Sequence, residues 1–161
     1  TDGVNSWLVI EHRVNVFGVS DAHRDWDRLD VLPGIIDQLG DAATDIDGDG
    51  HADPEADPRP LWIGVTHAPY RRVLDAFTGA GADIIFGGHT HGGQVCLPGF
   101  GALVANCDIP LKQASGLSSW RRFGHTAALN VSAGLGHSIY APVRFACPPE
   151  ATLITLVPRD A

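Results

Sequence analysis

The fold of this chain is decided by residues 61–91, which read LWIGVTHAPYRRVLDAFTGAGADIIFGGHTH. Leu61–Thr66 is an apolar run and Asp83–Phe86 is a second one, so we predict a strand at each. Between them, Tyr70–Phe77 carries apolar residues at helical spacing. A right-handed strand–helix–strand crossover makes the two strands parallel and brings their carboxyl ends to one edge of a sheet.

Three histidines follow these two predicted strands. His67 comes directly after the first, while His89 and His91 lie in the glycine-walled loop GGHTHGGQ that follows the second. Imidazole is the commonest side-chain ligand for transition metals, and glycine leaves room for an ion and a substrate. The sequence therefore predicts a metal centre at which His67, His89 and His91 share one rim of the fold.

The sequence signals for the remaining helices and strands are weaker. Leu8–His12 and Val14–Val19 read as a strand pair, and a short helix is predicted from Pro33 to a stop at Gly40. Further strands are expected near 94–97, 102–105, 126–132 and 151–157. Because 161 residues fit one domain, we predict a single α/β (α+β), strand-rich domain over 1–161 with an acidic insertion at 41–59.

Charge is concentrated in that insertion. The net charge is −8, yet segment 41–57 contains seven acids and no Lys or Arg, and the remaining 12 acids nearly balance the 11 bases. No basic cluster suggests nucleic acid, and no run reaches the roughly 20 apolar residues of a membrane span. Since the chain lacks Met and a recognisable signal peptide, we expect a fragment or a processed product.

The insertion also contains a calcium-loop pattern, D-x-D-x-D-G-x-x-D, in which alternating carboxylates surround Ca²⁺. Ala56 stands where the twelfth position of such a loop has a bidentate acid, and no helices flank it. It resembles EF-hand-like and thrombospondin type 3-like loops, and the alternative is a solvated acidic insertion. The predicted calcium ligands are Asp45, Asp47, Asp49, His51 and Asp53.

Two strings, Thr66-His67-Ala68-Pro69 and GHTHGGQ at 88–94, together with the tail VSAGLG at 131–136, resemble the calcineurin-like metallophosphoesterases, in particular the YkuE-like branch. The resemblance covers residues 60–157 well and 5–40 loosely. It implies the carboxyl-terminal half of a four-layer αββα sandwich. It also implies a two-metal site of Mn, Fe or Zn that activates water to hydrolyse a phosphodiester or phosphomonoester. His67 and His89 would bind one ion and His91 the other.

The chain departs from that family in its missing motifs. An Asp-x-His ligand motif, a Gly-Asp after an apolar strand and a Gly-Asn-His are expected upstream and are not found. Asp21-Ala-His23 has the spacing of the first motif, but we interpret it as lying outside the metal site, because a similar segment of this branch follows the catalytic Asn-His. The resemblance then implies no catalytic residue in this chain and an inactive isolated half. It also implies association with the missing half or with itself, and an exported or membrane-attached parent.

Several assignments stay open. Arg144 and His137 are candidates for residues near the substrate, and Arg144 could equally form a surface ion pair. Cys96 and Cys107 could form a disulfide or be two buried thiols, whereas Cys147 is expected to be unpaired. The alternative to a hydrolase is a non-catalytic calcium- or metal-binding interaction module. A mononuclear zinc hydrolase is disfavoured because no general base is evident.

Overall fold

A mixed six-stranded sheet forms the centre of the computed structural model, which describes residues 6–10, 14–44 and 59–157. Its strand order is β1-β2-β3-β4-β8-β7, and a separate two-stranded sheet pairs β5 with β6. The strands are β1 (Ser6–Ile10), β2 (Val14–Val19), β3 (Leu61–Thr66), β4 (Ile84–Gly87), β5 (Cys96–Leu97), β6 (Gly101–Ala102), β7 (Gly116–Arg122) and β8 (His125–Val131). The helices are α1 (Leu32–Thr44) and α2 (Arg71–Gly79).

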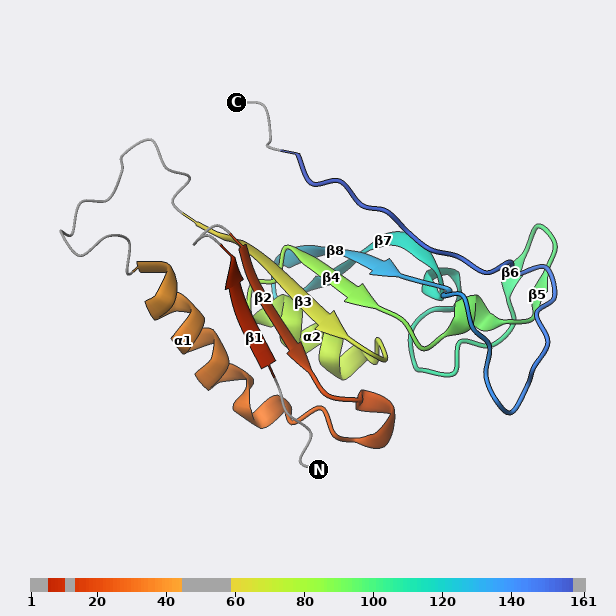
Figure 1. Ribbon diagram of the computed structural model, residues 1–161, viewed down its shortest axis with the longest axis horizontal. Helices are drawn as coiled ribbons and strands as arrows, with labels where there is room; N and C mark the ends of the chain where they lie inside the picture. Colours follow the sequence, from red (N-terminus) through yellow and green to blue (C-terminus); the bar gives the residue numbers. More distant parts are fainter. Residues whose placement is uncertain (1–5, 11–13, 45–58, 158–161) are drawn as a thin grey trace.

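The predicted crossover is confirmed. β3 and β4 pair in parallel, with Ile63 opposite Ile84 and Val65 opposite Phe86, and α2 connects them. β2 pairs in parallel with β3, and β4 in parallel with β8, while the outer strands β1 and β7 are antiparallel to their neighbours. Four strands therefore end at the same edge, where the loops after β2, β3, β4 and β8 gather (Figure 1).

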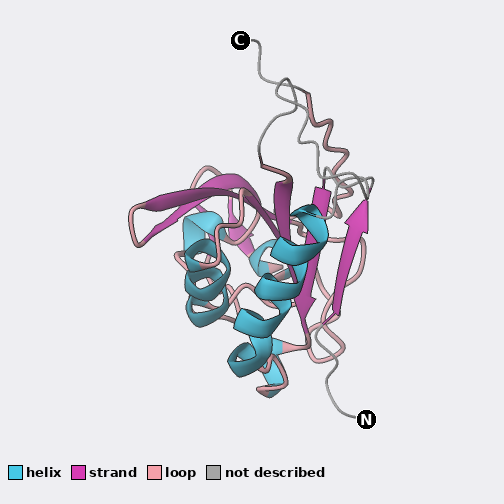
Figure 2. Ribbon diagram, turned by 90° about the vertical axis from the view of Figure 1, so that its left-hand side faces the viewer, coloured by secondary structure: helices cyan, strands magenta, loops and turns pink. Residues whose placement is uncertain are grey.

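Both helices cover one face of the sheet, as Figure 2 shows. The core lies between them and the sheet. The side chains of Phe17, Phe77, Ile85 and Leu129 are fully buried there, and the ring of Phe17 packs edge-on against Phe77 at 5.0 Å between centroids. Gly64 is required on β3, because a Cβ atom at this position would collide with the ring of Phe77.

The opposite face of the sheet carries no helix in the part of the chain that the structure describes (Figure 2). Apolar side chains on it stay exposed: Leu8 is 57% exposed, Val65 42% and Leu117 75%. The mixed α/β class is therefore confirmed, whereas the four-layer sandwich remains a prediction. No helix within the described ranges is long and apolar enough to cross a membrane.

The predicted boundary between the first helix and the acidic insertion is wrong. Helix α1 continues past Gly40 to Thr44, because one glycine costs a helix only about 1 kcal/mol and the following Asp-Ala-Ala is compatible with it. Residues 41–44 thus belong to the helix and not to the insertion. The predicted calcium ligands, from Asp45 to Asp53, lie outside the described residues.

The strand-rich second half also differs from expectation. β7 was not predicted, since its sequence GLSSWRR is mostly polar and lacks the alternation of a half-buried strand. Residues 151–157 are not a strand in the structure, although their sequence has the apolar character of one. Their side chains are exposed, including Leu153 at 94%, because no strand of the described residues pairs with them.

Candidate metal centre

Two of the predicted ligands meet at the carboxyl edge of the sheet. β3 positions His67 and the loop after β4 positions His89, so that Nδ1 of His89 lies 3.1 Å from Nε2 of His67. The two rings are edge-on, with centroids 4.9 Å apart. The predicted proximity of these two residues, 22 positions apart in the chain, follows directly from the parallel pairing of β3 and β4. We refer to them as the histidine pair.

The spacing of the histidine pair fits a shared metal ion. Two nitrogens that each bind one ion at about 2.0–2.1 Å, with an angle of about 90–110° at the metal, lie about 2.8–3.4 Å apart. The observed separation of 3.1 Å falls inside this interval. The pair supplies two donors only: among the described residues, no three His, Cys, Asp or Glu side chains converge closely enough to hold an ion by themselves.

Asn106 contacts the other nitrogen of His89. Its side-chain amide nitrogen lies 3.2 Å from Nε2 of His89. Turning the amide by half a rotation presents Oδ1 instead, which accepts the Nε2–H proton and leaves the Nδ1 lone pair directed at His67. This is the tautomer that a metal ligand needs, and outer partners of this kind commonly orient ligating histidines. The sequence contained no signal for this contact.

His23 lies beside the histidine pair, which corrects the interpretation of Asp21-Ala-His23 as a segment outside the site. The ring of His23 is 4.4 Å from that of His89 between centroids, and its Nδ1 is 3.0 Å from the hydroxyl of Tyr70. The carboxylate of Asp21 accepts a hydrogen bond from the backbone N–H of His23. The physical reason is that β2 is parallel to β3, so its carboxyl end reaches the same edge.

The pKa values of two of the histidines are shifted toward the neutral form. Burial lowers the pKa of His89, and the neighbouring His67 and His23 lower it further, because three positive charges would repel. Burial also lowers the pKa of His91, with Arg144 as the next cause. Neutral imidazole is the form that binds metals, so the electrostatics of the site favour ligation at neutral pH.

His91 is placed differently from the histidine pair. It lies in the same loop, with a left-handed φ of 50°, and its imidazole interacts with the backbone of Gly136, while its own backbone carbonyl accepts two further bonds. Arg144 Nη1 donates to that oxygen at 3.2 Å and the thiol of Cys147 donates at 3.3 Å. His137 is an electrostatic neighbour of His91, and its own Nδ1 lies 3.1 Å from the Ser138 carbonyl.

Arg144 connects several loops through their carbonyl oxygens. Besides His91, its guanidinium donates to Ala133 at 2.7 Å and to Gly134 at 3.1 Å. We call the side chain and its acceptors the arginine cluster; the acceptor carbonyls are those of His91, Ala133, Gly134, Gly136, Cys147 and Pro148. Since these bonds occupy the guanidinium, its position near the substrate stays a prediction, and the geometry favours a structural role.

Of the two alternatives for Cys96 and Cys107, the disulfide is not formed in the structure, and Cys107 is only partly buried. All three are free thiols, and Cys96 and Cys147 are buried. The thiol of Cys96 donates to the carbonyl of Gly92 at 3.3 Å, and the thiol of Cys147 contacts the same oxygen at 3.4 Å. Cys147, and not Cys107, is therefore the neighbour of Cys96.

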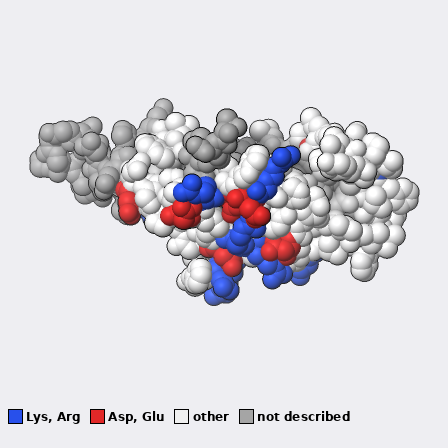
Figure 3. All heavy atoms as spheres, turned by 90° about the horizontal axis from the view of Figure 1, so that it is seen from below, with Lys and Arg blue, Asp and Glu red and all other residues white. Residues whose placement is uncertain are grey.

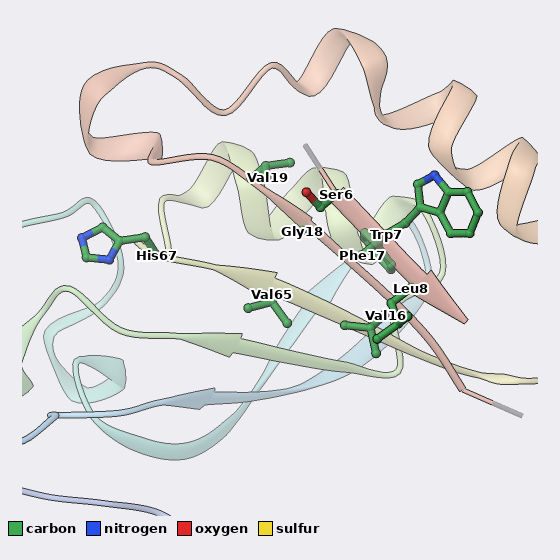
Figure 4. Close-up of a pocket in the computed structure, with 9 residues that line it drawn as sticks. All are labelled: Ser6, Trp7, Leu8, Val16, Phe17, Gly18, Val19, Val65 and His67. Carbon is green, nitrogen blue, oxygen red and sulfur yellow. The ribbon is translucent and has the colours of Figure 1, made fainter. Parts of the chain in front are cut away.

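A shallow pocket of about 370 Å³ begins at His67 and runs over the first three strands (Figure 4). Apart from His67 and Ser6 its lining is apolar, with residues such as Leu8, Val16 and Val65. It therefore provides no further metal ligands.

On another face of the molecule, basic and acidic side chains are interleaved, as Figure 3 shows. Arg72, for example, forms salt bridges with both Asp25 and Asp27.

Comparison with known proteins adds no constraint. No family model, no curated protein and no solved structure is similar to this chain.

Proposed function

We propose that this chain supplies the histidine ligands of a metal-dependent phosphoester hydrolase, either a phosphodiesterase or a phosphatase. The observation that supports the proposal best is the 3.1 Å separation between Nε2 of His67 and Nδ1 of His89. It is supported further by the lowered pKa of His89 and by the resemblance of the GHTHGGQ loop to the calcineurin-like metallophosphoesterases.

Each residue at the edge has a distinct task in this proposal. His67 and His89 bind a divalent ion of Mn, Fe or Zn as neutral donors, and Asn106 fixes the tautomer of His89. His91 contributes to a second ion. A divalent ion bound here would polarise a phosphoryl oxygen and lower the pKa of a coordinated water. The substrate is a phosphoester small molecule.

The residues that the structure describes do not complete a two-metal site. Neutral imidazoles cannot offset the charge of two adjacent divalent ions, and such ions need a bridging carboxylate. Asp21 is the acid that acts electrostatically on His89, but its carboxylate is engaged by the His23 amide and by Arg24 at 3.8 Å. We therefore propose that the isolated chain binds at most one transition-metal ion, hydrolyses little, and receives further ligands from another polypeptide segment.

The second candidate is a non-catalytic metal- or calcium-binding interaction module. The exposed apolar face of the sheet, with Leu8, Val65 and Leu117, is the observation that favours it, because apolar patches of this kind often contact other proteins. The same face is expected in a hydrolase whose other half covers it. We therefore expect self-association or binding of a companion chain in both cases; a strictly monomeric species by light scattering would contradict this.

Metal analysis tests the leading candidate. We expect at most one equivalent of Zn²⁺ or Mn²⁺ per chain by elemental analysis after dialysis, and its loss in His67→Ala. His125→Gln is the matched control, because His125 lies at the opposite end of β8 and its Nε2 donates to the Ala82 carbonyl, a bond that the glutamine amide can replace. Equal metal content in wild type and His67→Ala would refute the site.

Activity separates the hydrolase from the interaction module. The product of the whole parent gene, loaded with Mn²⁺, should hydrolyse a generic aryl phosphodiester, whereas the isolated chain should not. The same His67→Ala substitution in the whole product should abolish turnover, and His125→Gln should leave it unchanged. Metal binding without any turnover by the whole product would favour the module.

A further inference from the structure

The buried thiols of Cys96 and Cys147 converge on one atom. Cys96, the first residue of β5, donates to the carbonyl oxygen of Gly92 at 3.3 Å, and Cys147 reaches the same oxygen at 3.4 Å. Each side chain is less than a tenth exposed. The two thiols also interact directly as a side-chain hydrogen-bonded pair, and the 51 positions that separate them in the chain make this a contact of the folded state.

The backbones that carry the two thiols are held together independently. The N–H of Cys96 donates to the carbonyl of Phe145 at 2.9 Å, and the N–H of Phe145 donates to the carbonyl of Gln94 at 2.9 Å. Val95 and Phe145 form a parallel bridge. The segment that ends at Cys147 therefore runs beside β5, and the thiols meet because of the backbone pairing and not because of a side-chain conformation alone.

We propose that Cys96 and Cys147 form a disulfide under oxidising conditions and that this bond fastens residues 145–147 to β5, just after the GHTHGGQ loop. The oxidant is a low-molecular-weight disulfide. One protein thiolate attacks it and releases one small thiol, and the second protein thiolate then displaces the other small thiol. The two cysteines lose two protons and two electrons, and the small disulfide gains them. The reaction needs no metal, so it is independent of the proposed phosphoester chemistry.

The environment of the thiols predicts how the reaction proceeds. Burial raises the pKa of Cys96, and the neighbouring Cys147 raises it further. Because the thiolate is the attacking species, exchange is slow at neutral pH and accelerates as the pH rises. Once the bond forms, the carbonyls of Gly92 and His91 lose the thiol donors, while Arg144 still donates to His91.

Disulfide mapping tests the proposal. The folded chain is incubated with oxidised glutathione at pH 8.5, its free thiols are alkylated in denaturant, and the product is digested with chymotrypsin without reduction. Cleavage after Phe100 separates Cys96 from Cys107, which trypsin leaves on one peptide. We expect a cross-linked peptide that contains Cys96 and Cys147, lighter by two hydrogens, and an alkylated Cys107. A Cys96–Cys107 bond, or three alkylated cysteines, would overturn the proposal.

Cysteine variants and thermal unfolding provide a second test of the disulfide. Cys107→Ser should still form the cross-link, whereas Cys96→Ser and Cys147→Ser should not, with circular dichroism confirming that each is folded. In Cys107→Ser the oxidised form should unfold about 5–15 °C above the reduced form, because the bond restricts the unfolded chain. An oxidised form that unfolds at the same temperature or lower would show that the fold does not hold the thiols in bonding position.

Discussion

The histidine pair and the arginine cluster share one edge of the sheet, but their polar atoms are used in opposite ways. In the pair, a ring nitrogen of His67 and a ring nitrogen of His89 face each other at 3.1 Å. In the cluster, the guanidinium of Arg144 donates hydrogen bonds to carbonyl oxygens of several loops, including those of His91 and Ala133. We therefore expect the histidine side chains to bind a ligand, and the Arg144 side chain to hold the loops in place.

Removal of a ring from the pair should have the largest effect. We expect His67→Ala to weaken Zn²⁺ binding about 1,000-fold, or about 4 kcal/mol, because one of two donors is lost. The stability of the metal-free protein should change by less than about 0.5 kcal/mol. Isothermal titration calorimetry and urea unfolding measure the two quantities. Loss of stability without loss of affinity would place His67 with the structural residues.

Arg144→Ala should show the converse behaviour. Because several carbonyls lose a charged donor, we expect the free energy of unfolding to fall by about 2–4 kcal/mol. Zn²⁺ affinity of the protein that remains folded should change less than threefold. Arg144→Lys keeps the charge but cannot bridge several acceptors, so it should recover only part of the stability. If Arg144→Ala is as stable as wild type in urea, the arginine cluster does not hold the loops in place.

Removal of the Asn106 side chain should affect metal affinity less than removal of His67, because Asn106 contacts His89 and does not itself bind the ion. We expect Asn106→Ala to weaken Zn²⁺ binding about 10–100-fold, which is the usual effect of losing an outer partner. Asn106→Asp offers two acceptor oxygens and should restore the affinity. If Asn106→Asp binds as weakly as Asn106→Ala, the amide does not orient His89.

The smallest expected effect is the pH dependence of the metal-free protein. Burial and the neighbouring histidines lower the pKa of His89 in the folded state, so below about pH 6.5 the unfolded chain binds more protons than the folded one. The stabilisation is complete above that pH and is lost as the pH falls. Unfolding midpoints in urea should therefore decrease from pH 7 to pH 5, and by less in His89→Asn.

His89→Asn is the suitable variant for this comparison. The backbone of residue 89 has a left-handed φ of 64°, which asparagine adopts more readily than other non-glycine residues. Its neutral side chain removes the titration without adding backbone strain. An equal pH dependence in both proteins would assign the effect to other groups, such as His91, whose pKa is also lowered by burial.

Local patterns predicted the centre of the fold well and its outer parts poorly. The run Leu61–Thr66 and the stretch to Phe86 contain both strand signals and a helix between them, so β3, α2 and β4 could be derived. β7 could not, because pairing with β8 and packing of Trp120 near Asp75 on α2 stabilise a polar sequence. Tertiary contacts of this kind leave no periodicity in the sequence.

The candidate site shows the same division. His67 and His89 were predictable because each directly follows a strand of one crossover. His23 was misjudged, although it also follows a predicted strand, because its placement depends on which side of β3 the strand β2 joins. Asn106 and the contact between Cys96 and Cys147 depend on irregular loops, whose course neither strand nor helix periodicity describes.

The parallel pairing of β4 with β8 has a kinetic consequence. Residues 88–124 connect these strands, and this connection contains the GHTHGGQ loop, β5, β6 and β7. Closing so long a connection costs chain entropy before the pairing compensates for it, and folds rich in such pairs reach their native state slowly. We expect the histidine loop to become ordered only late in folding, together with the closure of the sheet.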